Sequence, residues 1–186
     1  MADNDKDVID LLLSQHEEIK RLFAEVEAAP VDARAEPFQR LVRLLAVHET
    51  AEEEIVHPYA RRKLATGDAV VDERLAEENA AKDMLTQMEK AGVTDPQFAA
   101  NLRTLKSAVV AHAEAEEREE FVQLRAQTSE TERRAMAAGV KAAEALAPTH
   151  PHAGVETATA NVLVGTPVAI MDRARDVIRK AMGKQS

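Results

Sequence analysis

The sequence predicts an all-α fold, in which an up-down-up-down four-helix bundle is followed by a C-terminal helical extension. The composition is 45% hydrophobic, mostly Ala, Leu and Val, and only 3% aromatic, which favours packed helices over sheets. Apolar residues recur every three or four positions in four long segments, as on one face of a helix. The segments are joined by short connections, so consecutive helices should be antiparallel neighbours. We expect residues 1–127 to form the bundle and residues 128–186 the extension.

The first half of the bundle is expected to be a hairpin of two helices. The first helix should run from about Ile9 to Val26 and should end at the turn Ala29-Pro30-Val31-Asp32. The second should run from about Glu36 to Leu64. Pro58 has no amide donor, which predicts a kink in this helix near His57.

The second half of the bundle repeats this plan. A third helix is expected from about Ala69 to Lys90, and Gly92 should close it. The segment Thr94-Asp95-Pro96 offers a capping residue and a proline suited to a first helical turn. A fourth helix should therefore begin there and run to about Arg125.

The extension contains two further segments with helical patterns. Ser129 to Leu146 is rich in Ala and predicts a fifth helix, and Ala147 to Gly154 predicts a rigid linker. Val155 to Met182 is mildly amphipathic and is interrupted at Gly165-Thr166-Pro167. It predicts one or two short helices that either pack on the bundle or form a dimer arm.

Polar residues occupy inward positions of all four predicted helices. His48 and Glu52 are four residues apart, so both lie on one helical face, and the same spacing recurs 64 residues later at His112 and Glu116. Aligning the two halves of the bundle places one more candidate on the first helix of each half: His16 and Glu78. The chain therefore resembles one helical hairpin written twice.

This polar set predicts a metal site inside the bundle. An unpaired carboxylate in a helical core costs several kcal/mol, and a cation would remove that cost. Two cations bridged by Glu52 and Glu116 would use the imidazoles and Glu78 as terminal ligands. Nitrogen and oxygen ligands without sulfur suit iron or manganese. One such histidine alone could be an ordinary core residue, but the repeated set favours a metal.

Neighbouring acids should orient the imidazoles of such a site. A metal-bound histidine generally donates its second ring N–H to a carboxylate, a carbonyl or water. Glu49, Glu53 and Glu117 are close enough in sequence to serve in this way.

These motifs resemble the hemerythrin-like HHE cation-binding family over about residues 8 to 125. The resemblance is carried by His16, His48-x-x-x-Glu52 and His112-x-x-x-Glu116. The extension is similar to that of actinobacterial members with an A-P-T-x-P-H-x-G-V-E segment, here Ala147 to Glu156. The resemblance implies a four-helix bundle that holds two iron ions in an oxo- or hydroxo-bridged di-iron site, with manganese as an alternative. It also implies reversible O2 binding, sensing of O2, iron, redox state or nitric oxide, or peroxide decomposition.

The sequence departs from the family pattern at one ligand position. The third helix of family members normally supplies a histidine, whereas this chain has Glu78. A carboxylate adds negative charge and favours Fe(III), which counts against a reversible O2 carrier and favours redox, peroxide or nitric oxide chemistry. His57 is a further candidate ligand that could replace the missing imidazole. In an ideal helix it would face about 140° from Glu52, so only the kink at Pro58 would bring it inward.

The functional expectation is therefore a di-iron protein that acts on or senses O2, peroxide or nitric oxide, with an unidentified electron donor. Weak catalase- or peroxidase-like activity is one option, but no catalytic group stands apart from the metal ligands, so enzyme status stays open. Two alternatives remain: iron binding or storage without catalysis, and a helical interaction module whose site is degenerate.

The composition narrows the partners and the compartment. The net charge of −9 and the pI of about 5.2 disfavour binding to nucleic acid or to anionic membranes. The absence of Cys excludes disulfides, thiolate chemistry and iron–sulfur clusters. No signal-peptide core is visible, and no apolar run reaches the roughly 18 residues of a membrane span. We expect a cytoplasmic monomer or homodimer.

Overall fold

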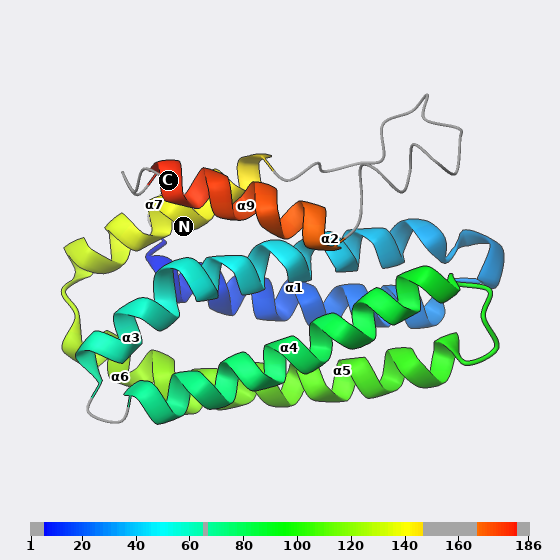
Figure 1. Cartoon of the computed structure of the whole chain (residues 1–186), viewed down its shortest axis with the longest axis horizontal. Coiled ribbons are helices and arrows are strands. Elements are labelled where there is room, and N and C mark those ends of the chain that lie inside the picture. Colours follow the sequence, from blue (N-terminus) through cyan, green and yellow to red (C-terminus); the bar gives the residue numbers. More distant parts are fainter. Residues whose placement is uncertain (1–5, 65–66, 147–166, 182–186) are drawn as a thin grey trace.

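Four long helical segments run side by side in the computed structural model, which describes residues 6–64, 67–146 and 167–181 (Figure 1). The first segment is α1 (Val8–Ala28), and a short 3₁₀ turn, η2 (Val31–Ala33), leads into the second. The other three segments contain α2 (Ala35–Ala51), η3 (Glu52–Val56) and α3 (His57–Lys63); α4 (Gly67–Ala91); and α5 (Phe98–Ala115), η4 (Glu116–Phe121) and α6 (Val122–Gln127). The described ranges contain no strand, so the all-α prediction is confirmed.

The start of α1 is fixed by a capping box. The Asp7 carboxylate accepts hydrogen bonds from the backbone N–H groups of Ile9 and Asp10, and the Asp10 side chain accepts one from the Asp7 backbone. Arg133 donates a hydrogen bond of 2.6 Å to the other Asp7 oxygen. The cap of α1 is thereby tied to α7, the helix that follows the bundle.

The second and fourth segments each contain a π-helical turn that begins at the glutamate of a His-x-x-x-Glu pair. These turns, η3 and η4, begin at Glu52 and Glu116. η3 lies directly before the position of the predicted kink, and α3 follows it with Pro58 in its first turn. At that position the missing amide donor of proline costs little.

The fourth helical segment begins later than the sequence predicted. Gly92 ends α4 with a positive φ of 83°, but residues 93–97 form turns and α5 begins only at Phe98. The Asp95 side chain accepts a hydrogen bond from the backbone N–H of Gln97, so it stabilises a turn. The expected helix start at Thr94-Asp95-Pro96 is therefore wrong.

The apolar core consists of two clusters separated by a layer of polar side chains. One cluster lies toward the α2 start and the α4–α5 connection and includes Phe23, Leu41 and Leu105. The other lies toward the start of α1 and includes Leu12 and Phe121. Along each helical segment of the bundle, the predicted ligands fall between residues of the two clusters. The polar layer is therefore enclosed by packed apolar side chains at both ends.

The described parts of the extension are the helices α7 (Glu130–Leu146) and α9 (Pro167–Ala181), which lie along one side of the bundle (Figure 1). α9 packs against both α2 and α7, and α7 packs against α1. Ala174 and Ile178 of α9 are buried in the core cluster that contains Leu12. The predicted linker at Ala147 to Gly154 lies outside the described residues.

No helix within the described ranges combines the length and the hydropathy that a membrane span requires.

Candidate metal centre

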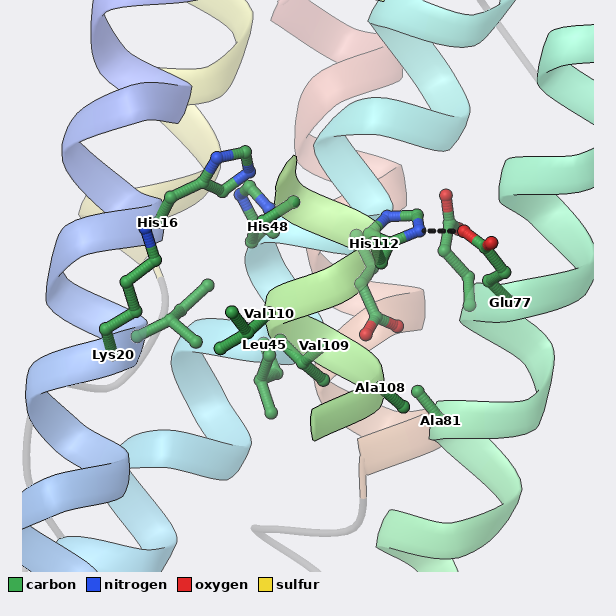
Figure 2. Close-up of a pocket in the computed structure, with 14 residues that line it drawn as sticks. His16, Lys20, Leu45, His48, Glu77, Ala81, Ala108, Val109, Val110 and His112 are labelled. Carbon is green, nitrogen blue, oxygen red and sulfur yellow. Dashed lines mark hydrogen bonds and ion pairs between the residues drawn. The ribbon is translucent and has the colours of Figure 1, made fainter. Parts of the chain in front are cut away.

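All seven residues that the sequence singled out lie inside the bundle at one level. Each is at most 9% exposed, although three of the seven carry carboxylates. All four helical segments contribute to this set. His16 lies on α1 and Glu78 on α4, while His48, Glu52 and His57 lie on α2, η3 and α3, and His112 and Glu116 lie on α5 and η4. Figure 2 shows His16, His48 and His112 converging from three helices.

Six of these residues form two overlapping groups of potential ligands. His16 and His48 make one group with Glu52 and Glu116. Glu78 and His112 make a second group with the same two glutamates. Within each group the ligand atoms lie within 4.8 Å of one another. Because Glu52 and Glu116 belong to both groups, the arrangement suits two neighbouring cations bridged by these carboxylates.

The inward-facing atoms of this layer lack the partners that buried polar atoms normally have. The Nε2 atoms of His16 and His112 each lie 3.4 Å from a Glu116 oxygen, and His48 Nε2 lies 3.4 Å from Glu52. These separations exceed ordinary N–H···O hydrogen bonds. Both oxygens of Glu52 and of Glu116, and Nε2 of His16 and His112, have no hydrogen-bond partner. Buried orphan atoms that face one another fit a bound cation.

The outward-facing nitrogen of each of these histidines is held by an oxygen acceptor. The Nδ1 atoms donate hydrogen bonds of 2.7–2.9 Å, and the donor–acceptor pairs are His16–Glu117, His48–Gln15 and His112–Glu77. Such bonds fix the ring orientation and leave Nε2 available as a ligand. His48 differs from the other two because its partner is an uncharged amide.

Only one of the three predicted orienting acids has that role. Glu117 holds His16, whereas Glu49 and Glu53 lie beside the ammonium group of Lys82. Lys82 also lies 3.4 Å from Glu78. Helical rotation explains the error, because residues next to a ligand in sequence point away from it, and the orienting groups come from neighbouring helices.

His57 is buried, and it contacts Glu120, a glutamate that the sequence analysis did not single out. Its Nε2 lies 2.6 Å from Glu78, and its Nδ1 lies 3.2 Å from Glu120, which is 0% exposed. Glu120 follows Glu116 by four residues, so the one-face helical spacing was a usable signal. It was hidden in the acidic run that follows Glu116.

The pKa values of Glu52 and Glu116, the two candidate bridging ligands, are shifted in opposite directions. Burial and the charge of Glu116 raise the pKa of Glu52 well above its usual value. Burial also acts to raise the pKa of Glu116, but the imidazoles of His112 and His16, each 3.4 Å away, outweigh it and hold this pKa well below its usual value. Without cations, the layer must therefore hold protons among these carboxylates and imidazoles.

A small pocket adjoins the histidines on one side of the polar layer. It is lined by His16, His48 and His112 and by apolar residues about one helical turn before them, including Leu45 and Val109 (Figure 2). Four charged residues also line it: Lys20, Glu49, Glu77 and Glu78. It has room for only one or two water-sized molecules. His57 and Glu120 do not line it, because they lie toward the opposite core cluster.

Comparisons with known proteins agree with this architecture. The sequence pattern of the Hemerythrin HHE cation binding domain matches residues 7–124. A protein of Nostoc sp. named DNA nickase is 27% identical over 141 residues, which is 75% of this chain but only 40% of that protein. A crystal structure of a hemerythrin HHE cation-binding domain-containing protein from Mycobacterium kansasii is 18% identical. It superimposes with a TM-score of 0.56 over 97% of this chain and 95% of that one, which shows the shared fold.

Proposed function

Because this chain belongs to the hemerythrin HHE cation-binding family, we propose that it holds two iron ions and acts on or senses O2, peroxide or nitric oxide in the cytoplasm. The observation that carries the proposal is the pair of ligand groups that share Glu52 and Glu116. Both oxygens of each shared carboxylate are buried without a hydrogen-bond partner. Nitrogen and oxygen ligands in this mixture suit iron, and manganese is the nearest alternative.

The two proposed ion positions differ in their ligands. One would be held by His16 and His48, and the other by His112 and Glu78, with the shared glutamates completing both. Bound iron would supply a centre that changes oxidation state. The second position has three carboxylates and one imidazole, so it should favour the higher oxidation state. This asymmetry supports redox, peroxide or nitric oxide chemistry over reversible O2 carriage.

The pocket beside the histidines supports a small ligand. Its walls away from the imidazoles are mainly apolar, as with Ile19, Leu45 and Ala81, and it accepts only a molecule of about water size. A diatomic gas or hydrogen peroxide satisfies this limit, and a larger organic substrate does not. The apolar packing also limits the water that reaches the proposed ions.

The proposal is tested by metal analysis and visible absorption of full-length protein from iron-supplied cells. The wild type should carry two irons per chain and an iron-dependent visible absorption. The double variant His48→Ala, His112→Ala should lose both. Glu114→Ala is the matched control, since Glu114 lies between His112 and Glu116 in sequence but is exposed.

The remaining outcomes separate the alternatives. Reaction of the iron-loaded wild type with peroxide, nitric oxide or O2, followed by absorption and gas evolution, would support the proposal and identify the ligand. Stable iron without any reaction would favour binding or storage. A folded wild type without bound metal would contradict the proposal and leave a helical interaction module.

DNA nicking is not included in the proposal. The Nostoc protein of that name matches over only 40% of its length, and the acidic net charge of −9 opposes binding to a polyanion.

A further inference from the structure

Three histidines of the polar layer share one hydrogen-bonding pattern. In each of His16, His48 and His112, one ring nitrogen lies 2.7–2.9 Å from an oxygen that orients the ring. The other nitrogen lies 3.4 Å from a buried inward carboxylate. The shorter distance is that of a hydrogen bond, and the longer one is the separation of two ligands on a common cation.

His57 differs from these three histidines, because both of its ring nitrogens lie at hydrogen-bond distance from a buried carboxylate. Nε2 lies 2.6 Å from Glu78, a hydrogen-bond distance, and Nδ1 lies 3.2 Å from Glu120. If Nε2 donates its proton to Glu78, the neutral ring directs the Nδ1 lone pair at the Glu120 carboxylate. A positive charge must therefore lie between Nδ1 and the Glu120 carboxylate, and either a proton on the ring or a metal ion can supply it.

Glu120 itself indicates where that ion would lie. Its side chain is 0% exposed, and its Oε2 atom is buried without a hydrogen-bond partner. Ligand atoms of His57, Glu116 and Glu120 all lie within 4.8 Å of one another. The Glu116 oxygens, which also have no hydrogen-bond partner, therefore lie close to His57 and Glu120.

We propose that His57 Nδ1, Glu120 and Glu116 form a third cation site, next to the two sites of the proposed iron pair. The inference rests in part on the proposed function, because Glu116 is shared. One imidazole and two carboxylates, without sulfur, suit a divalent transition metal such as Mn²⁺, Fe²⁺ or Zn²⁺. The site lies on the side of the polar layer away from the pocket, so its ion neutralises buried charge and stays remote from the small ligand.

The test is the number of metal ions bound by full-length protein that has been stripped of metal and reloaded with Zn²⁺. After gel filtration, the wild type should retain three ions per chain and Glu120→Gln should retain two. Glu119→Gln is the matched control and should retain three, since this neighbouring side chain is 39% exposed and pairs with Arg118. Two ions in both the wild type and Glu120→Gln would overturn the proposal.

A second measurement keeps the test decisive if Glu120→Gln fails to fold, as judged by circular dichroism. Crystals of the Zn²⁺-loaded wild type should give a third anomalous peak beside His57 Nδ1. A peak pair at the shared glutamates without the third would overturn this inference alone and would mean that a proton lies between His57 Nδ1 and Glu120. Absence of all peaks would overturn the proposed function as well.

Discussion

The backbone N–H of His57 donates a hydrogen bond to the carbonyl oxygen of Glu52, five residues earlier in the same helix. This π-helical bond widens one turn, so that both side chains face the core, and they are 2% and 0% exposed. In a regular α-helix, residues separated by five positions point in different directions, about 140° apart. The π turn therefore brings His57 to the inward face, which the sequence analysis had expected from a kink at Pro58.

The π turn predicts an unusual tolerance to deletion. Removing Glu54 should return the turn to α geometry and leave His57 four residues after Glu52, still on the same face. The loss of the ion pairs with Arg175 and Arg179 should lower the free energy of unfolding by only about 1–2 kcal/mol. Denaturant unfolding and metal content measure this. Deletion of Arg43, in the α-helical part of the same segment, is the control. It rotates the two flanks by about 100° and should abolish folding; equal effects of the two deletions would contradict this account.

The hydrogen bond from His112 to Glu77 predicts an effect on metal affinity. Glu77→Gln should weaken binding of Zn²⁺ by about 10–100-fold, because the neutral amide orients the imidazole less strongly and makes it less basic. Competition with a fluorescent chelator measures the affinity. Glu73→Gln, at a position on the same helix with a side chain that is 65% exposed, should leave it unchanged. An unaltered affinity in Glu77→Gln would show that Glu77 does not support the ligand.

Metal uptake should release protons at neutral pH. Burial opposes the charged form of His112, but the carboxylate of Glu116, 3.4 Å away, and the hydrogen bond to Glu77 together raise its pKa to about 9. The metal-free protein therefore carries an extra proton on His112 at pH 7, whereas a histidine that binds a metal must be neutral. Affinity should rise with pH up to about 9. Calorimetric titrations in buffers of different ionisation enthalpy should show at least one proton released at pH 7. A lack of proton release would be incompatible with His112 as a ligand.

Glu89, remote from the polar layer, predicts a pH-dependent stability. Burial raises its pKa from 4.5 to about 7. Folded protein then holds more protons than unfolded protein between these values, so stability falls as pH rises from about 4.5 to 7. Glu89→Gln should be more stable than the wild type at pH 8, by on the order of 1 kcal/mol, and indistinguishable from it below pH 4.5. Thermal unfolding at both pH values measures this. Asp83→Asn, at an exposed position of α4, should show no such crossover.

The attachment of α9 to the bundle should depend on apolar packing more than on surface ion pairs. Ile178 is 1% exposed in the core cluster, so Ile178→Ala should lower the free energy of unfolding by about 2–4 kcal/mol. Arg179→Ala removes a half-exposed ion pair with Glu54 and should cost less than about 1 kcal/mol. Urea unfolding compares the two variants. Equal losses would mean that the ion pairs hold the helix.

The sequence by itself determined the helical class of this protein and most of its polar layer. Apolar residues at helical spacing fix which face of each helix is buried, and His-x-x-x-Glu pairs on that face necessarily point into the core. Local geometry is sufficient for such statements, because residues four apart on one helix have a fixed relationship. His48 with Glu52 and His112 with Glu116 could therefore be identified from the sequence before any helix was placed.

Tertiary structure decided every relationship that crosses from one helix to another. The pairings of His48 with Gln15 and of His112 with Glu77, and the burial of Glu120 against His57, depend on how far each helix is rotated against its neighbours. The two π turns decided which acidic residues face inward, and nothing in a run of glutamates marks the turn in advance. Rotation and register are set by packing of the whole core, so they follow from the assembled bundle and not from local sequence.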